Sequence, residues 1–153
     1  MRHKLNIKVT NDYDFKYKKK FNKIMKIFCE EFNINKKINV DLLITDNDGI
    51  KTINNDYRGI NAPTDILSFP FGNFIDYESI KYKYKPLGEI VMSFEKILDQ
   101  AEEFNHSEMR EFCYMFSHGL VHLNGLDHKK NKDEEIEFNS HVNNIIKIIG
   151  VVR

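Results

Sequence analysis

This 153-residue sequence lacks long apolar runs, an excess of either charge, and all but two cysteines. Because no apolar run is long enough to cross a bilayer, we expect no transmembrane helix and no membrane partner. The first ten residues, MRHKLNIKVT, lack the apolar core of a signal peptide, so we expect a cytoplasmic protein. The net charge is zero, so overall basicity does not point to a nucleic-acid partner.

The scarcity of cysteine limits what cross-links can do for the fold. Cys29 and Cys113 are the two cysteines, and each lies within an apolar pattern of helical spacing. One disulfide is arithmetically possible. We expect instead two buried thiols in a reducing compartment.

The sequence does contain the pattern of a globular domain, with 41% hydrophobic residues over a length typical of one domain spanning 1–153. Strand-like patterns cover 5–9, 38–45, 66–69 and 88–93. Helical periodicity and capping signals predict helices over about 14–33, 46–57, 93–104, 107–124 and 133–149. A polar, tyrosine-rich loop is expected at 72–86.

Capping residues mark where several of these helices begin. Asp46 and Ser93 each follow a predicted strand and suit the N-cap position. Asn105 with Glu108 resembles a capping box, in which the side chain of each residue accepts a hydrogen bond from the backbone N–H of the other. Asp133 is expected to open the last helix.

The neutral total conceals an uneven distribution of charge. Residues 1–37 carry eleven Lys or Arg and four Asp or Glu, a balance of +7, whereas residues 38–128 carry seven and fifteen, a balance of −8. A basic stripe on the first helix could bind a polyanion. A lysine-rich face that is merely solvated explains the same pattern equally well.

Three histidines in the segment SHGLVHLNGLDH form the strongest chemical signal. His118 and His122 are four residues apart on a predicted helix, so their imidazoles share one face and can bind one ion about 2 Å from each. Gly125 permits a sharp exit from the helix, after which His128 can supply a third ligand. Three protein ligands leave one position open, as in catalytic zinc sites. Packed, structural histidines are the alternative.

The spacing H-x-x-x-H-x-x-G-x-x-H equals that of metzincin proteases, with one departure. Those enzymes place a glutamate directly after the first histidine as general base, whereas Gly119 stands here. A peptidase is therefore disfavoured. Asp127, next to the third histidine, is a candidate to orient His128, bind the metal or hold its water, or is simply a turn residue.

Arg58 is the second candidate catalytic residue. It is one of few arginines in a lysine-dominated chain and lies beside Gly59, in a predicted loop before a strand. A guanidinium binds phosphate with a planar fork that lysine cannot reproduce. A surface salt bridge is the alternative.

Ser68 has no elbow glycines around it and is expected to be structural. The remaining histidines, His3, His106 and His141, are expected to be ordinary surface residues.

Two blocks of sequence resemble a known family. HGLVHLNGLDH (118–128) resembles the H-G-x-L-H-L-x-G-Y-D-H signature of the YbeY metalloproteins. YRGINAPTDILSFPF (57–71) and LGEIVMS (87–93) resemble two further segments of that family, in the same order. Three positions depart from its pattern: Glu89, Val121 and Leu126.

The resemblance implies an α/β (α+β) fold, with a mixed four-stranded sheet flanked by about five helices and a metzincin-like histidine helix. It implies a cytoplasmic, single-strand-specific endoribonuclease that matures the 3′ end of small-subunit ribosomal RNA and serves ribosome quality control. Its partners would be single-stranded RNA, the small subunit or assembly factors, and not DNA. One Zn²⁺ would be held by His118, His122 and His128, and Arg58 would be important for function.

Two other functions stay open at this point. One is a metallopeptidase, against which Gly119 argues. The other is a non-catalytic, zinc-containing ribosome-assembly factor. A structural zinc site is normally closed by four protein ligands, and Asp127 is the obvious fourth candidate nearby.

Overall fold

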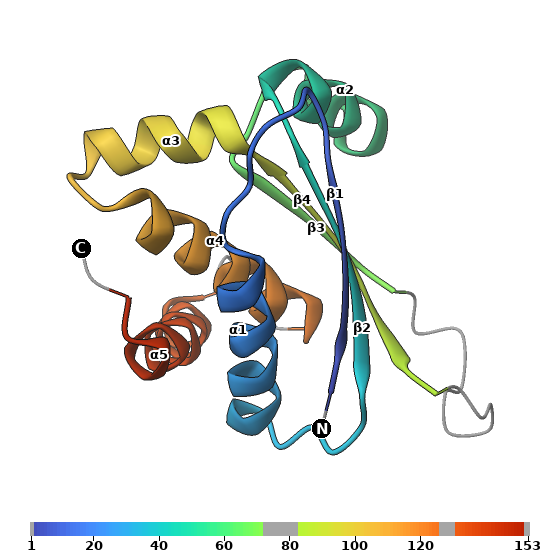
Figure 1. The fold of residues 1–153 in the computed structure, drawn as a ribbon, viewed down its shortest axis with the longest axis vertical. Coiled ribbons are helices and arrows are strands. Elements are labelled where there is room, and N and C mark those ends of the chain that lie inside the picture. Colours follow the sequence, from blue (N-terminus) through green and yellow to red (C-terminus); the bar gives the residue numbers. More distant parts are fainter. Residues whose placement is uncertain (1, 72–82, 126–130, 152–153) are drawn as a thin grey trace.

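The computed structural model describes residues 2–71, 83–125 and 131–151. Its centre is a four-stranded sheet in the order β1-β2-β4-β3 (Figure 1). The strands are β1 (Lys4–Val9), β2 (Ile38–Thr45), β3 (Ile66–Pro70) and β4 (Lys85–Ser93). β2 pairs in parallel with both β1 and β4, and β3 pairs with β4 in the antiparallel sense. The sheet is therefore mixed, as expected, and β3 forms one of its edges.

Five helices surround this sheet: α1 (Lys18–Glu31), α2 (Asn47–Arg58), α3 (Phe94–Glu103), α4 (Glu108–Leu123) and α5 (Lys132–Ile149). α1, α4 and α5 contact one another, and α4 also packs on β3 and β4 (Figure 1). α2 lies against the opposite face, where Ile50 joins Leu67 and Val91 in a small separate core. The predicted fold class is confirmed.

Strand alternation separates these two cores. Along β2, Ile38, Val40, Leu42 and Ile44 are buried in the main core, whereas Leu43 packs against the small core. Residues two apart on a strand face the same side, so this single strand supplies both faces. The main core is sealed by aromatic side chains of the helices. For example, the rings of Phe21 and Phe116 stack at 4.2 Å between centroids.

Gly119 allows α4 to lie close to the sheet. A Cβ atom at this position would meet Ile66 Cδ1 at 2.9 Å, Ile90 Cδ1 at 3.0 Å and Ser68 Oγ at 3.3 Å. Contacts this short require the neighbours to shift. The glycine therefore sets the distance between the histidine helix and strand β3, and with it the width of the space beside them.

Two of the predicted capping residues are correct, and the predicted capping box is wrong. Asp46 and Ser93 are N-caps, with side chains that accept hydrogen bonds from Gly49 N and Lys96 N. The predicted capping box at Asn105 is wrong, because Asn105 has a left-handed φ of 54° and follows the end of α3. The cap of α4 is Ser107, which accepts from Arg110 N at 3.1 Å.

Three other boundaries differ from expectation. α1 begins at Lys18, not at 14, because the preceding aromatic residues form an irregular segment that packs on the core; Tyr13 stacks on Phe94 at 4.2 Å between ring centroids. β4 begins at Lys85, three residues early, because that end pairs with the start of β2 across a register shift at Asn39. α5 starts at Lys132 with Asn131 as its cap, rather than at Asp133.

Both cysteines are buried and free, as predicted. Among the helices of the described residues, none has the length and apolar character needed to span a bilayer.

Candidate metal centre and its cleft

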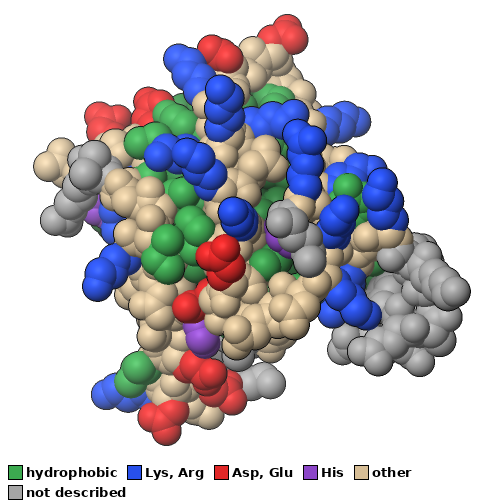
Figure 2. All heavy atoms as spheres, turned by 60° about the horizontal axis from the view of Figure 1, so that its bottom comes forward, with side chains coloured by type: hydrophobic (Ala, Val, Ile, Leu, Met, Phe, Trp, Pro, Cys, Tyr) green, Lys and Arg blue, Asp and Glu red, His purple; other side chains and the backbone are tan. Residues whose placement is uncertain are grey.

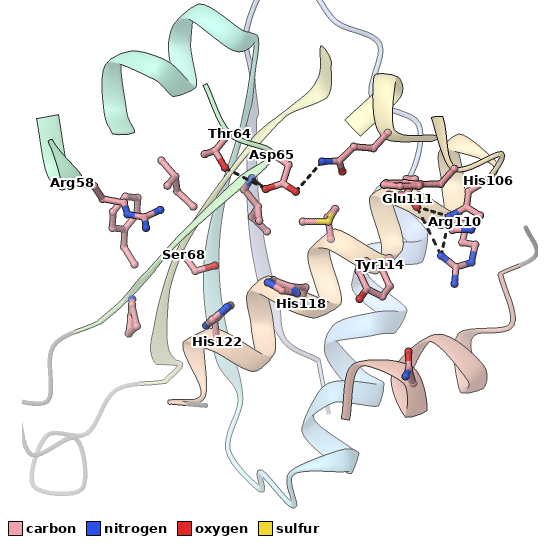
Figure 3. Close-up of a pocket in the computed structure, with 18 of the residues that line it drawn as sticks. Arg58, Thr64, Asp65, Ser68, His106, Arg110, Glu111, Tyr114, His118 and His122 are labelled. Carbon is pink, nitrogen blue, oxygen red and sulfur yellow. Dashed lines mark hydrogen bonds and ion pairs between the residues drawn. The ribbon is translucent and has the colours of Figure 1, made fainter. Parts of the chain in front are cut away.

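A cleft of about 1170 Å³ runs between the edge strand β3 and the helix α4. Its walls come from the end of α2, the segment leading into β3, β3 itself, the end of α3 and the length of α4 (Figure 3). Residues far apart in sequence therefore meet here, including Arg58, His118 and His122. The lining is mixed, with arginines, histidines and carboxylates among apolar side chains.

His118 and His122 lie one turn apart on α4, near its C-terminal end, and both line the cleft. Their ring centroids are 4.9 Å apart and their planes are inclined by 63°. This separation lets one ion lie about 2 Å from a nitrogen of each ring. The pair was predicted from four-residue spacing, and the structure brings the two side chains together.

Phe138 of α5 packs against both imidazoles, and sequence inspection did not single it out. Its ring centroid lies 4.8 Å from that of His118 and 4.7 Å from that of His122, and it is fully buried. The helical spacing with Val142 and Ile145 identifies it as a core residue but does not show what it covers. It restricts the orientations of both rings and provides an apolar backing to the site.

The third predicted ligand, His128, and Asp127 fall in 126–130, outside the described residues. Within the described ranges, no group of three His, Cys, Asp or Glu side chains is placed to hold a metal. Gly125, the last residue before that segment, lines the cleft and has a left-handed φ of 88°. Two adjacent imidazoles on a cleft wall fit zinc or another imidazole-binding ion.

Arg58 is the last residue of α2, not a loop residue, and its side chain lies on the cleft wall opposite the histidines (Figure 3). Gly59 ends the helix in the left-handed conformation, with φ at 68° and its N–H donated to Asn55 O at 3.0 Å. This termination turns the chain toward β3 directly after the arginine. The structure thus brings Arg58 to the same cleft as His118 and His122.

Position 119, where metzincins have a glutamate, has no space for a side chain. Because a Cβ at residue 119 would point at Ile66, Ile90 and Ser68, any side chain there would be directed into the sheet. Ser68 is half-buried against this glycine, in agreement with a structural role. The described part of the chain therefore offers no room for a metzincin-like base after the first histidine.

Asp65 is a cleft residue that the sequence did not single out, although it stands in the Pro-Thr-Asp turn. Its Oδ1 accepts from Ile66 N at 2.7 Å, and its Oδ2 accepts from Gln100 Nε2 at 3.0 Å. Its own carbonyl accepts from Ser93 N at 3.0 Å. These bonds tie the start of β3 to β4 and to α3, so Asp65 positions the cleft wall.

A second polar cluster lies at the far end of the cleft and includes His106. His106 Nδ1 lies 2.6 Å from Glu111 Oε1, and Arg110 Nη1 lies 3.3 Å from the same histidine nitrogen. Glu111 is almost fully buried. Burial also raises the pKa of the neighbouring Tyr114. His106 and Glu111 are five residues apart, which is not the spacing of two metal ligands on one helix, so the sequence pattern does not indicate this pair.

The expectation that the remaining histidines are ordinary surface residues is wrong for all three. His106 belongs to the cluster just described. His3 Nδ1 accepts a hydrogen bond from Ile38 N at 3.1 Å, and burial lowers its pKa. His141 Nδ1 lies 3.2 Å from Glu31 Oε2 and joins α5 to α1.

Comparison with known proteins identifies relatives over almost the whole chain. The family model described as Endoribonuclease YbeY matches residues 4–150. The Endoribonuclease YbeY of Mycoplasmopsis pulmonis is 47% identical over 151 residues, which cover 97% of this chain and 98% of the relative. That of Mycoplasma mobile is 37% identical over 153 residues, covering 100% and 99%. A solution structure from Thermotoga maritima shares the fold, with a TM-score of 0.62 and 24% identity over 95% of this chain and 88% of that one.

Proposed function

The chain belongs to the Endoribonuclease YbeY family, and from this premise we propose that it is a zinc-dependent endoribonuclease acting on single-stranded RNA. Its substrate would be ribosomal RNA, at the 3′ end of the small-subunit species, and its role would extend to ribosome quality control in the cytoplasm. The small subunit or its assembly factors would be its partners. The observation that carries the proposal is the meeting of two imidazoles and Arg58 in one cleft.

His118, His122 and His128 would hold one zinc ion, which when bound supplies Lewis acidity toward a phosphate oxygen or a water molecule. Phe138 would keep the two helical imidazoles in a fixed orientation and exclude water from behind them. Arg58 would bind the phosphate with its planar fork and offset the negative charge that develops there. Asp127 would act beside the third ligand.

Two observations argue against peptide hydrolysis. The first is the closed position at Gly119. The second is the edge of β3, where an extended peptide would have to add as a strand. Ser93 N bonds to Asp65 O and Phe71 N bonds to Leu87 O, so residues 65 and 71 direct their backbone groups toward β4. By alternation, the backbone N–H and C=O groups of residues 66, 68 and 70 point away from β4, toward the free edge. Ile66 donates its N–H to Asp65, and Pro70 has none, so Ser68 is the one residue of β3 whose outward N–H could bond to a peptide carbonyl.

The test combines metal analysis with cleavage of an end-labelled single-stranded RNA. We expect His118→Ala to lose both metal and cleavage. Arg58→Ala should keep its metal and lose about a hundredfold in cleavage rate, the usual effect of removing one charge-stabilising donor. His141→Ala, which removes a histidine outside the cleft, is the control and should retain both properties. Full cleavage by metal-free His118→Ala protein would refute zinc dependence, and metal binding without any RNA cleavage would favour an assembly role.

The products identify the nucleophile. RNA carries its own 2′-OH, which makes attack possible without the glutamate that Gly119 replaces. A 2′,3′-cyclic phosphate end would indicate attack by the 2′-OH, and its absence from early time points would indicate attack by water. Casein hydrolysis that disappears in His122→Ala would instead establish a peptidase.

A further inference from the structure

The cleft extends well beyond the histidines, along a row of four side chains on α4. Arg110, Tyr114, His118 and His122 follow at intervals of four residues, and all four line the cleft. The guanidinium carbon of Arg110 lies 5.7 Å from the Tyr114 ring centroid, and that ring lies 6.4 Å from the ring of His118. Figure 3 shows Arg110 at one end of this row and Arg58 of α2 beyond the other end, with the histidines between the two arginines.

Arg110 is held at the wall by a buried carboxylate. Glu111 Oε1 lies 3.9 Å from Arg110 Nη1 and 2.6 Å from His106 Nδ1, with only 6% of its side chain exposed. Within the described residues the polar contacts of the Arg110 side chain all use Nη1. A guanidinium has five N–H donors, so Nη2 and Nε keep theirs for a ligand. The arrangement orients a cation toward the cleft without consuming its hydrogen-bonding capacity.

An exposed aromatic ring lies near His106, the histidine that contacts this arginine. Phe104, at the end of α3, lines the cleft and is 52% exposed, and its ring lies 6.2 Å from that of His106. A single exposed aromatic is unremarkable on a convex surface. In a cleft that an arginine also lines, the same ring offers a face on which a nucleobase can stack.

The length of α4 gives the spacing of this second site from the histidines. Eight residues separate Arg110 from His118, which is about 12 Å along the helix at ~1.5 Å per residue. A stacked strand advances about 3.4 Å per nucleotide, so the interval spans three to four nucleotides. It is too long for one nucleotide to touch both sites.

We propose that Arg110 and Phe104 form an RNA subsite that binds a phosphate and a base three to four nucleotides from the bond that is cut. The inference rests on the proposed function, since it takes the strand to run from Arg58 past His118 and His122. Tyr114 then lies under the intervening nucleotides, and Glu111 acts as a positioning residue for Arg110. An arginine and a ring together recognise any single strand, which suits a sequence-tolerant grip rather than base readout.

Two properties separate the roles of these residues. Removal of one phosphate contact lowers the salt dependence of binding, whereas removal of a stacking ring lowers affinity without changing that dependence. We therefore expect Arg110→Gln to bind an eight-nucleotide strand about tenfold more weakly, with a shallower salt slope. Phe104→Ala should bind it about fivefold more weakly with the wild-type slope. Arg110→Lys should restore the slope and only part of the affinity, because lysine lacks the planar fork.

The experiment measures binding of 2′-O-methyl RNA strands of two and eight nucleotides by fluorescence anisotropy, over a range of salt concentrations. Lys147→Gln and Ile148→Ala, an exposed cation and an exposed apolar residue of α5, are the matched controls and should bind both strands like the wild type. The two cleft variants should lose affinity for the long strand and leave that for the dinucleotide unchanged.

Each outcome decides a separate question. Equal loss for both strand lengths, or wild-type binding of the long strand by both cleft variants, would overturn the subsite while RNA cleavage by the wild type still upheld the proposed function. A wild-type protein that neither binds nor cleaves single-stranded RNA would overturn both. Glu111→Gln should weaken binding of the eight-nucleotide strand in part, as Arg110→Gln does. If it binds the dinucleotide like the wild type, the result supports the positioning role.

Discussion

At the scale of single residues, Gly119 determines how closely the histidine helix approaches the sheet. Gly119→Ala adds a methyl group 2.9 Å from Ile66 Cδ1, which overpacks the interface. Overpacking costs about 1–3 kcal/mol, and the better helix propensity of alanine offsets up to about 1 kcal/mol. We expect a net loss of about 1 kcal/mol in the free energy of unfolding, measured by urea denaturation.

A second substitution checks that the loss comes from this contact. Ile66→Val removes the Cδ1 atom that the new methyl group would meet. The double variant Gly119→Ala, Ile66→Val should therefore be more stable than the sum of the two single effects predicts. Strict additivity, or a stability gain in Gly119→Ala alone, would show that α4 is not held at this distance by the glycine.

The two buried thiols give a prediction at the same scale. Burial raises the pKa of Cys29 from 9.0 to about 12 and that of Cys113 to about 11. In the unfolded chain both thiols ionise near 9, so this contribution to stability is complete below pH 9. It is lost as the pH rises from 9 toward 11 for Cys113 and toward 12 for Cys29. Titration with a thiol reagent at pH 8 should detect almost no reaction in the native protein and two thiols after denaturation.

The individual site residues differ in how far the sequence could reveal them. His118 and His122 were predictable because both belong to one helix, and four-residue spacing fixes their relation. Arg58 was predictable as a candidate from its residue type, but its meeting with the histidines depends on how α2 ends and how β3 packs. The pair formed by His106 and Glu111 bridges a helix start, where no periodic pattern reports contacts.

At the scale of elements, α5 completes the site that α4 begins. Phe138 contacts both imidazoles, so Phe138→Leu should loosen the rings while keeping an apolar side chain in the core. Changes around metal ligands commonly lower metal affinity ten- to a hundredfold, and we expect Phe138→Leu to lower the affinity of the proposed site for zinc about tenfold. Competition with a chelator measures the change. Phe28→Leu, the same substitution at a fully buried position of α1, is the control for general destabilisation and should keep wild-type zinc affinity.

Element boundaries show why local signals sometimes fail. Asp46 and Ser93 cap helices because each directly follows a strand, where the chain is already extended. Asn105 looks equally suitable in sequence, yet the tight connection after α3 requires a left-handed residue there, and the cap moves to Ser107. Such a connection is set by the packing of α3 against α4, which no local pattern encodes.

At the scale of the whole molecule, the charges are divided as the sequence indicated. α1 is amphipathic in the structure: Phe21, Ile24 and Phe28 are buried, whereas lysines occupy its exposed side. Figure 2 turns the lower end of the molecule toward the viewer and shows many Lys and Arg side chains spread over that face. A neutral protein can therefore still present a locally positive surface to RNA.

We predict that this positive surface binds RNA outside the cleft. Lys19, Lys23 and Lys26 are exposed and share the solvent side of α1, so Lys→Gln changes at all three remove charge without altering the core. Each phosphate contact with a single strand contributes about −0.7 to the slope of log affinity against log salt, so the triple variant should have a slope shallower by up to about 2. Cleavage at saturating RNA should stay at the wild-type rate, because the histidines and Arg58 are untouched. An unchanged slope would show that these lysines only solvate the helix.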